Sequence, residues 1–256
     1  MLMLHGDMRT SRSWDAVIRD LRSQFHIISL NNRGNGDSDW TETGYRFENR
    51  VADLTAFCES LDIKNTIGVG HSTGAVVMTL VAERIPETFN RLILLEPMIV
   101  VNERFQRMVS NADRPTKTRR TWASREELHE YLKQHPATRR WRADVIRDVA
   151  ALETMELSDG SIDMKWAQAT MSWKEREGDY LDLRPAFRAL GVPVLFIASG
   201  DRRSAFEELD PLMAEIPDFH VVTVERTGHN MYMERPDAVS RAIKDFVGGK
   251  GLPASI

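Results

Sequence analysis

The sequence predicts an α/β protein in which a doubly wound, mostly parallel sheet carries an inserted helical segment. Short runs rich in Leu, Ile and Val alternate with amphipathic stretches along the chain. Prolines stand at the ends of the expected elements. The alternation stops near Pro97 and resumes at Val192. The length of 256 residues suits one large α/β domain or a core with an inserted subdomain.

Several short runs have the composition of parallel strands that are buried on both faces. They are Met1–Leu4, His26–Leu30, Thr66–Gly70, Arg91–Leu95, Val192–Ser199 and Phe219–Val224. A sheet of this class usually has an edge hairpin before the first of these strands. Because Met1 already lies in the first run, we expect this N-terminal hairpin to be missing.

Between these runs lie stretches with apolar residues at helical spacing, each able to pack one face on the sheet. Helices are expected over Trp14–Ser23, Phe47–Leu61, Thr73–Arg84, Phe206–Ile216 and Asp237–Val247. Parallel neighbours need crossover connections, so these helices should cover both faces of the sheet.

Residues 98–189 contain no strand-like run and are expected to form a helical cap on a core made of residues 1–97 and 190–256. A segment of this length is too long for an unstructured loop in a folded domain. It contains large apolar side chains that could line a substrate pocket or form the core of the cap, and the second use is the commoner one. These are Trp122, Trp141, Trp166, Trp173, Met164 and Met171.

Charge and composition exclude several classes of protein. With 34 basic and 38 acidic residues the net charge is −4, so no pervasive basic field is available for nucleic acid. No apolar run approaches the roughly 20 residues that span a bilayer. Cys58 is the only cysteine, and no H-E-x-x-H motif or EF-hand loop is present, so neither a metal nor a cofactor is expected. We expect a cytoplasmic protein, and the sequence specifies no oligomeric state.

The strongest functional signal is Gly70-His71-Ser72-Thr73-Gly74, which fits G-x-S-x-G between an expected strand and an expected helix. A serine at a strained turn needs neighbours without bulk, and the helix N-terminus stabilises developing negative charge. Ser72 is therefore the candidate nucleophile, and a serine needs a base within hydrogen-bond reach. His229, in Thr227-Gly228-His229 after the last expected strand, is the candidate base.

With these motifs in this order, the chain resembles the α/β-hydrolase fold superfamily, in particular esterase-like serine hydrolases with an inserted cap. Leu4-His5-Gly6-Asp7 resembles the family's oxyanion loop, and Asn31–Ser38 resembles its D-x-R-G-x-G-x-S turn with Asn31 in place of aspartate. The resemblance implies an oxyanion hole made by the backbone N–H groups of Asp7 and Thr73. Many relatives carry a neutral residue at the position of Asp7. An acidic side chain there is unfavourable near a developing oxyanion unless it points away.

Two carboxylates are candidates for the acid of a catalytic triad. Asp201 follows the penultimate expected strand, the family's commonest acid position, but it directly follows Gly200 where the usual spacing is G-x-x-D. Glu96 ends the strand that begins at Arg91, where some members, including many haloalkane dehalogenases, place the acid. The family's usual position gives Asp201 a small preference, and both stay candidates. Either one could orient the imidazole of His229.

The resemblance implies a cofactor-independent serine hydrolase that cleaves small to medium apolar carboxylic esters through an acyl-enzyme on Ser72. Haloalkane dehalogenases and epoxide hydrolases of this fold use an aspartate nucleophile, which Ser72 excludes. Hydrolysis of a C–C bond, a lactone or an amide by the same triad is an alternative. So is a slow-turnover ligand receptor, which Asp7 and the irregular acid position would fit. The clusters Arg119-Arg120 and Arg139–Arg142 are solvated faces, or contain one arginine that binds a substrate carboxylate.

Overall fold

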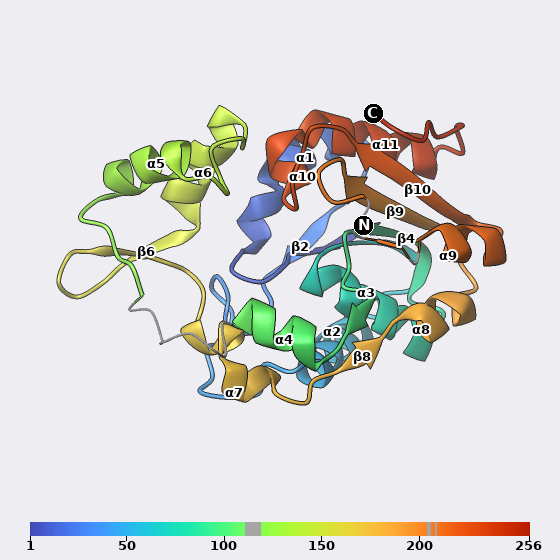
Figure 1. Ribbon diagram of the computed structural model, residues 1–256, viewed down its shortest axis with the longest axis horizontal. Helices are drawn as coiled ribbons and strands as arrows, with labels where there is room; N and C mark the ends of the chain where they lie inside the picture. Colours follow the sequence, from blue (N-terminus) through green and yellow to red (C-terminus); the bar gives the residue numbers. More distant parts are fainter. Residues whose placement is uncertain (111–118, 204–205, 208) are drawn as a thin grey trace.

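The computed structural model describes residues 1–110, 119–203, 206–207 and 209–256. Its centre is an all-parallel sheet with the strand order β10-β9-β4-β3-β1-β2 (Figure 1). The strands are β1 (Leu2–Leu4), β2 (Ile28–Leu30), β3 (Thr66–His71), β4 (Phe89–Leu95), β9 (Val194–Ser199) and β10 (Phe219–Val224). Each predicted strand overlaps one of them, so the predicted fold class is confirmed.

The chain reverses its direction across the sheet between β1 and β3. From β1 it moves outward to the edge strand β2, and it then returns to place β3 on the other side of β1. In open α/β sheets, the crevice at such a switch point, beyond the carboxyl ends of the strands, is the usual ligand site. The loops that follow β1 and β3 begin at His5 and Ser72, so the sequence motifs meet at this crevice.

Helices cover both faces of the sheet, because alternate residues of each buried strand point to opposite sides. Met3, Val69 and Ile93 belong to one apolar cluster, and their neighbours Leu2, Leu92 and Leu94 belong to the other. The first face carries η1 (Ser11–Trp14), α1 (Asp15–Leu21), α10 (Met231–Glu234) and α11 (Pro236–Val247). The second carries α2 (Phe47–Ser60), α3 (Thr73–Arg84), α8 (Arg184–Ala189) and α9 (Leu209–Glu215) (Figure 1).

The expected helices are all present, and α3 has the predicted ends. α9 begins later than predicted, at Leu209. α2 ends at Ser60, shortly before Asp62, which adopts a left-handed backbone conformation with φ 47°. A residue in this conformation just past the last turn is a common helix terminator.

The predicted insertion contains α4 (Glu103–Ser110), α5 (Arg125–Gln134), α6 (Ala143–Leu152), η2 (Gln168–Met171) and α7 (Trp173–Arg176). The expectation of no strand here is wrong in detail. β5 (Val100–Val101) pairs with β8 (Leu181–Asp182), and β6 (Thr154–Glu156) pairs with β7 (Ile162–Met164), both antiparallel. These strands are too short to produce a sequence pattern, and none of those described joins the main sheet.

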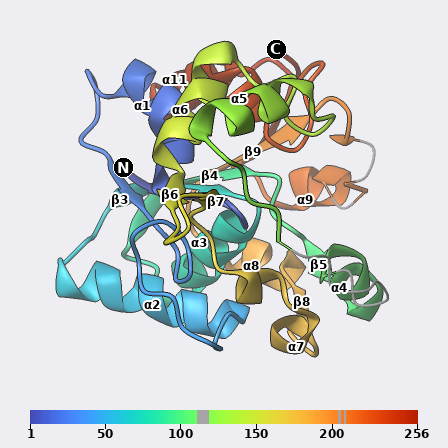
Figure 2. The same ribbon diagram turned by 90° about the vertical axis from the view of Figure 1, so that its left-hand side faces the viewer.

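Within this insertion, α5 and α6 lie side by side and apart from α4 and α7 (Figures 1 and 2). α8 packs on α3 and α9, and its Phe187 is buried in the apolar cluster on the second face of the sheet. The insertion was expected to extend to residue 189, so α8 belongs to the predicted cap but packs on the core. The division of the chain into core and cap stays a prediction. Among the described residues, no helix is long and apolar enough to cross a membrane.

Candidate active site

Ser72 occupies a strained turn between β3 and α3. Its backbone adopts φ 52° and ψ −120°, and its N–H donates to the carbonyl of Leu95 at 2.8 Å. A Cβ atom at Gly70 would lie 2.5 Å from Cα of Ala75, and one at Gly74 would lie 2.4 Å from the carbonyl oxygen of Leu4. The two glycines of the motif are therefore required by close backbone packing. A left-handed serine costs about 1–3 kcal/mol and persists only where its surroundings enforce it.

His229 follows β10 and is held by a buried carboxylate. Its Nδ1 lies 2.6 Å from Oε2 of Glu96, whose residue is 1% exposed. The other oxygen of Glu96 accepts hydrogen bonds from the backbone N–H and the hydroxyl of Ser199, at 2.9 and 2.5 Å. Burial acts to raise the pKa of Glu96, but its interactions with His229, Ser199 and Arg202 together lower this pKa. An ionised Glu96 can accept a hydrogen bond from Nδ1 of His229 when that nitrogen carries the proton.

Asp201, the other candidate acid, points elsewhere. It is exposed, and its Oδ2 accepts from Nη2 of Arg140 at 2.7 Å. The small preference for Asp201 is corrected by this geometry, because the carboxylate bonded to His229 is that of Glu96. The irregular spacing was the informative signal. The third residue after Gly200, where the family's pattern expects an aspartate, is Arg203, which pairs with Asp210.

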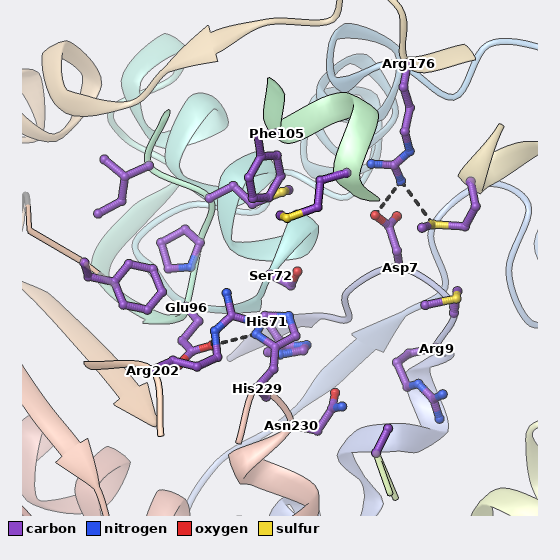
Figure 3. Close-up of a pocket in the computed structure, with 18 of the residues that line it drawn as sticks. Asp7, Arg9, His71, Ser72, Glu96, Phe105, Arg176, Arg202, His229 and Asn230 are labelled. Carbon is purple, nitrogen blue, oxygen red and sulfur yellow. Dashed lines mark hydrogen bonds and ion pairs between the residues drawn. The ribbon is translucent and has the colours of Figure 1, made fainter. Parts of the chain in front are cut away.

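Ser72, His229 and Glu96 face one cavity of about 590 Å³ (Figure 3). Neutral Nε2 of a histidine whose Nδ1 is protonated can accept a proton from a serine hydroxyl. Among the described residues, the hydrogen bond that joins two of these three side chains is the one from His229 to Glu96, and catalytic hydrogen bonds to a serine are often long before a substrate binds. The arrangement is compatible with a nucleophile, a base and an orienting acid.

The two expected oxyanion donors lie beside Ser72. Thr73 is the first residue of α3, and Asp7 follows the loop residue Gly6. Within the described ranges, neither backbone N–H donates to a protein acceptor. The N-terminus of α3 adds a partial positive charge at the same point.

The carboxylate of Asp7, which lines the cavity, is held between two arginines. Its oxygens accept from Nη1 of Arg50 at 2.7 Å and from Nη2 of Arg176 at 2.5 Å. The hydroxyl of Thr73 donates to the same oxygen as Arg176, at 2.8 Å. Burial acts to raise the pKa of Asp7, but Arg176 and Arg50 lower it far below its ordinary range.

Two further histidines are structural parts of the site. His5 is fully buried and bonds Gly6 O through Nδ1 at 2.7 Å, while its Nε2 accepts from the N–H of Asn32 at 3.0 Å. Burial lowers the pKa of His5 to about 4, so it is neutral at physiological pH. Nε2 of His71 donates to the carbonyl of His229 at 2.9 Å, and burial lowers the pKa of His71 well below 6.5.

The cavity wall is mostly apolar and comes from both the sheet loops and the predicted insertion. Its apolar side chains include Met98, Ile99, Phe105, Met108, Trp141 and Phe206. Of the tryptophan and methionine candidates in the insertion, Trp141 and Met171 line the cavity, while Trp122 and Met164 are buried in an apolar cluster. The arginines that line the cavity are Arg9, Arg176 and Arg202, none of which belongs to the two clusters noted in the sequence.

No group of three or more His, Cys, Asp or Glu side chains in the described ranges is arranged to hold a metal ion. The lone thiol, Cys58, is buried on α2, away from the cavity.

A family model described as the alpha/beta hydrolase family matches residues 1–242. The chain belongs to the alpha/beta hydrolase family. It is 25% identical to the hydrolase YugF of Bacillus subtilis, over 96% of this chain and 89% of the relative. It is 26% identical to the 2-(acetamidomethylene)succinate hydrolase of Mesorhizobium japonicum, over 96% and 87%.

The crystal structure of E-2-(acetamidomethylene)succinate hydrolase aligns with this alpha/beta hydrolase at a TM-score of 0.82 and 25% identity. The alignment covers 97% of this chain and 91% of the other. These hydrolase relatives support an enzyme of the superfamily.

Sequence reasoning missed Arg50, Arg176 and Ser199, which hold the carboxylates of the site. Arg50 lies on α2 and Arg176 on α7, and no local motif marks either one. The available signal was Asp7 itself, because an aspartate beside an oxyanion site requires a cationic partner. For Ser199, the signal was its position: it ends β9, which lies next to β4, and Glu96 directly follows β4.

Proposed function

We propose that this protein is a serine hydrolase that cleaves small to medium apolar carboxylic esters through an acyl-enzyme on Ser72. The observation that carries this proposal is the 2.6 Å contact between Nδ1 of His229 and Oε2 of buried Glu96, beside a serine held at φ 52°. A histidine ordered in this way is a general base, and a serine exposed at a helix N-terminus is its natural partner.

The reaction proceeds in two steps. His229 accepts the proton of the Ser72 hydroxyl as the oxygen attacks the ester carbonyl, and then protonates the leaving alcohol. A water molecule, activated by the same imidazole, hydrolyses the acyl-enzyme. In both steps the backbone N–H groups of Asp7 and Thr73 bind the negatively charged oxygen, and each such donor stabilises the transition state by about 2.7–4 kcal/mol.

The proposed substrate class follows from the wall of the cavity. Side chains such as Phe105, Met108 and Trp141 offer apolar contacts on the side of the predicted cap. A cavity of about 590 Å³ lies in the middle of the range for small-molecule sites. An acyl chain or an apolar alcohol of moderate size could contact these apolar side chains.

A panel of p-nitrophenyl esters from acetate to dodecanoate tests the proposal, with Ser72→Ala as the matched control. We expect a pre-steady-state burst of p-nitrophenol equal to the concentration of active sites, followed by slower turnover that is fastest at intermediate acyl length. Absence of both burst and turnover across the panel would contradict the proposal. It would instead favour the slow-turnover receptor.

A second candidate function is hydrolysis of an amide that carries a carboxylate. The guanidinium groups of Arg9 and Arg202 line the cavity. Nη1 of Arg9 lies 3.9 Å from Oε2 of Glu153, and Nε of Arg202 lies 3.4 Å from Oε2 of Glu96, so a substrate carboxylate would share each arginine with a carboxylate of the protein. One 26% identical relative is a 2-(acetamidomethylene)succinate hydrolase, whose named substrate is a dicarboxylate. Comparison of a neutral ester with its carboxylate-bearing analogue separates the candidates. Arg9→Met should depress only the anionic substrate if the second candidate is right.

A further inference from the structure

Asp7 presents an electrostatic problem that the surrounding residues resolve. The proposed mechanism places its backbone N–H against a developing oxyanion, while its own carboxylate is anionic and only 14% exposed. In a partly buried site, two negative charges a few ångströms apart repel strongly, because little water screens them. An unpartnered Asp7 would therefore raise the energy of the transition state that its N–H is meant to stabilise.

The partners of Asp7 come from two distant parts of the chain. Arg50, which is 3% exposed, approaches from α2, and Arg176, which is 4% exposed, approaches from α7 in the predicted cap. Arg176 is itself fixed, because its Nε and Nη2 donate to the carbonyl of Thr170 at 3.0 and 2.8 Å. Figure 3 shows Arg176 reaching Asp7 at the rim of the cavity.

The same carboxylate also links the two expected oxyanion donors. The backbone N–H of Thr73 is one of the expected oxyanion donors, and its side-chain hydroxyl donates a hydrogen bond to Oδ2 of Asp7 at 2.8 Å. Arg176 binds that oxygen too, at 2.5 Å. The contact from Arg176 thus adds to the charge compensation that Arg50 provides, and it holds the carboxylate through which the loop of Asp7 is bonded to Thr73.

We propose that Arg176 is a positioning residue of the oxyanion hole, acting through the carboxylate of Asp7 to couple the predicted cap to catalysis at Ser72. The inference rests on the proposed serine-hydrolase function. Arg176 does not exchange protons with the substrate. Together with Arg50 it compensates the charge of Asp7, and it sets the orientation of the loop, so its effect falls on kcat more than on KM.

The central test is a double-mutant cycle of Arg176→Gln and Asp7→Asn, measured on the best p-nitrophenyl ester. Arg176→Gln leaves Asp7 with Arg50 as its remaining cationic partner in the described chain and frees Oδ2 of Asp7 from the cap. We expect kcat to fall roughly tenfold to a hundredfold. In the Asp7→Asn background there is no charge to cancel, so the added change Arg176→Gln should alter kcat by less than about threefold. A purely structural role for Arg176 predicts similar losses in both backgrounds.

Acidification gives a second readout. Arg176 on α7 and Arg50 on α2 act directly on Asp7, and His5 and Arg9 lie on its own loop. Asp179, beyond α7, interacts with the same two arginines. Loss of Arg176 raises the pKa of Asp7, so lowering the pH protonates it more readily in the variant. The ratio of the Arg176→Gln rate to the wild-type rate should therefore rise as the pH falls, and a flat ratio would oppose the proposal.

The matched control is Arg119→Gln. Arg119 also lies in the predicted cap and pairs with a buried carboxylate, Asp163, at 2.7 Å, but it does not line the cavity. Its activity should stay within about twofold of wild type. If Arg176→Gln does not fold, Arg176→Lys replaces it. The lysine variant keeps the positive charge but cannot bond both Asp7 and Thr170 as the guanidinium does. Its kcat should therefore fall less than that of the glutamine variant would.

The outcomes separate the inference from the proposed function. Ester turnover by wild type, with Arg176→Gln equally active or with independent losses in the cycle, overturns the inference and leaves the serine hydrolase standing. A wild-type protein that neither turns over esters nor is labelled at Ser72 by a fluorophosphonate overturns both. A fall in kcat caused by Arg176→Gln in the wild-type background, but not in the Asp7→Asn background, supports both the inference and the proposed function.

Discussion

Glu96 and Asp201 end neighbouring strands of one sheet, yet only one of them meets the histidine. Glu96 follows β4, is 1% exposed, and has both oxygens bonded by His229 and Ser199. Asp201 follows β9, is exposed, and pairs with Arg140 at the surface. The comparison teaches that the position of a carboxylate after a strand is not sufficient. Enclosure and direction determine whether it can orient an imidazole.

The direction of Glu96 has a backbone cause. Its φ of 44° is left-handed and turns the chain sharply at the end of β4. This conformation costs about 1–3 kcal/mol in a residue with a side chain, and such strain is typical of functional positions. Three hydrogen bonds to the Glu96 carboxylate, two of them from Ser199, stabilise the strained geometry. Asp201 has no comparable constraint and remains at the surface.

The largest loss of activity should come from replacing Ser72 or His229, which the mechanism needs whichever carboxylate is the acid. Ser72→Ala and His229→Ala should each reduce ester hydrolysis by about three to six orders of magnitude, because they remove the nucleophile or its base. The double variant should be hardly worse than either single one. Steady-state rates with tight control for contaminating esterase check this. A Ser72→Ala protein with most of its activity would refute the nucleophile assignment.

Glu96→Gln should come next, with a loss of up to about 10⁴-fold in kcat. The amide cannot stabilise the imidazolium and favours the wrong tautomer of His229. Single-turnover acylation by a p-nitrophenyl ester measures the loss without a contribution from product release. An acylation rate within tenfold of wild type would mean that Glu96 is not the acid.

Asp201→Asn should change kcat by less than about threefold, since its partner is Arg140 and not His229. An exposed ion pair of this kind stabilises a fold by about 0.2–1 kcal/mol, so the midpoint of unfolding should shift little. The same acylation assay and urea unfolding test both statements. A loss as large as that of Glu96→Gln would reverse the comparison between the two carboxylates.

The smallest expected effect concerns a third buried carboxylate, Glu153, at the end of α6. It is 1% exposed and accepts from the Ser13 hydroxyl at 2.6 Å, while Arg9 lies 3.9 Å away. Burial raises the pKa of Glu153, with Arg9 and Ser13 opposing the shift. A raised native pKa means that the folded state holds its proton longer, so stability falls as the pH rises through that pKa.

Glu153→Gln removes this loss because its side chain stays neutral. The variant should gain stability relative to wild type, by about 1 kcal/mol, between pH of about 5 and about 8. Urea unfolding at the two pH values measures the difference. A gain that is independent of pH would contradict the assignment of Glu153 as the titrating group.

Much of the fold could be predicted from sequence because its signals are local and periodic. The buried strands are continuous apolar runs, and α3 follows directly from the pattern after Ser72. Ser72 and His229 could be proposed because each sits in a short motif at the end of a strand. Their assignment needed no knowledge of long-range packing.

The remaining features depend on contacts between distant segments. The choice between Glu96 and Asp201 depends on which one Ser199 and His229 enclose, and no local pattern encodes this. The partners of Asp7 come from α2 and α7, so only the folded chain brings Arg50 and Arg176 together. The strands β5 to β8 have two or three residues each, too few for alternation to be recognised.

The central claim is that Glu96 holds the proton on Nδ1 of His229, and proton NMR of histidine-labelled protein tests it directly. A hydrogen-bonded Nδ1 proton gives a downfield signal, which is assigned by its loss in His229→Ala. We predict that the signal persists in Asp201→Asn and disappears or moves far upfield in Glu96→Gln. A signal that survives in Glu96→Gln and is lost in Asp201→Asn would contradict the account.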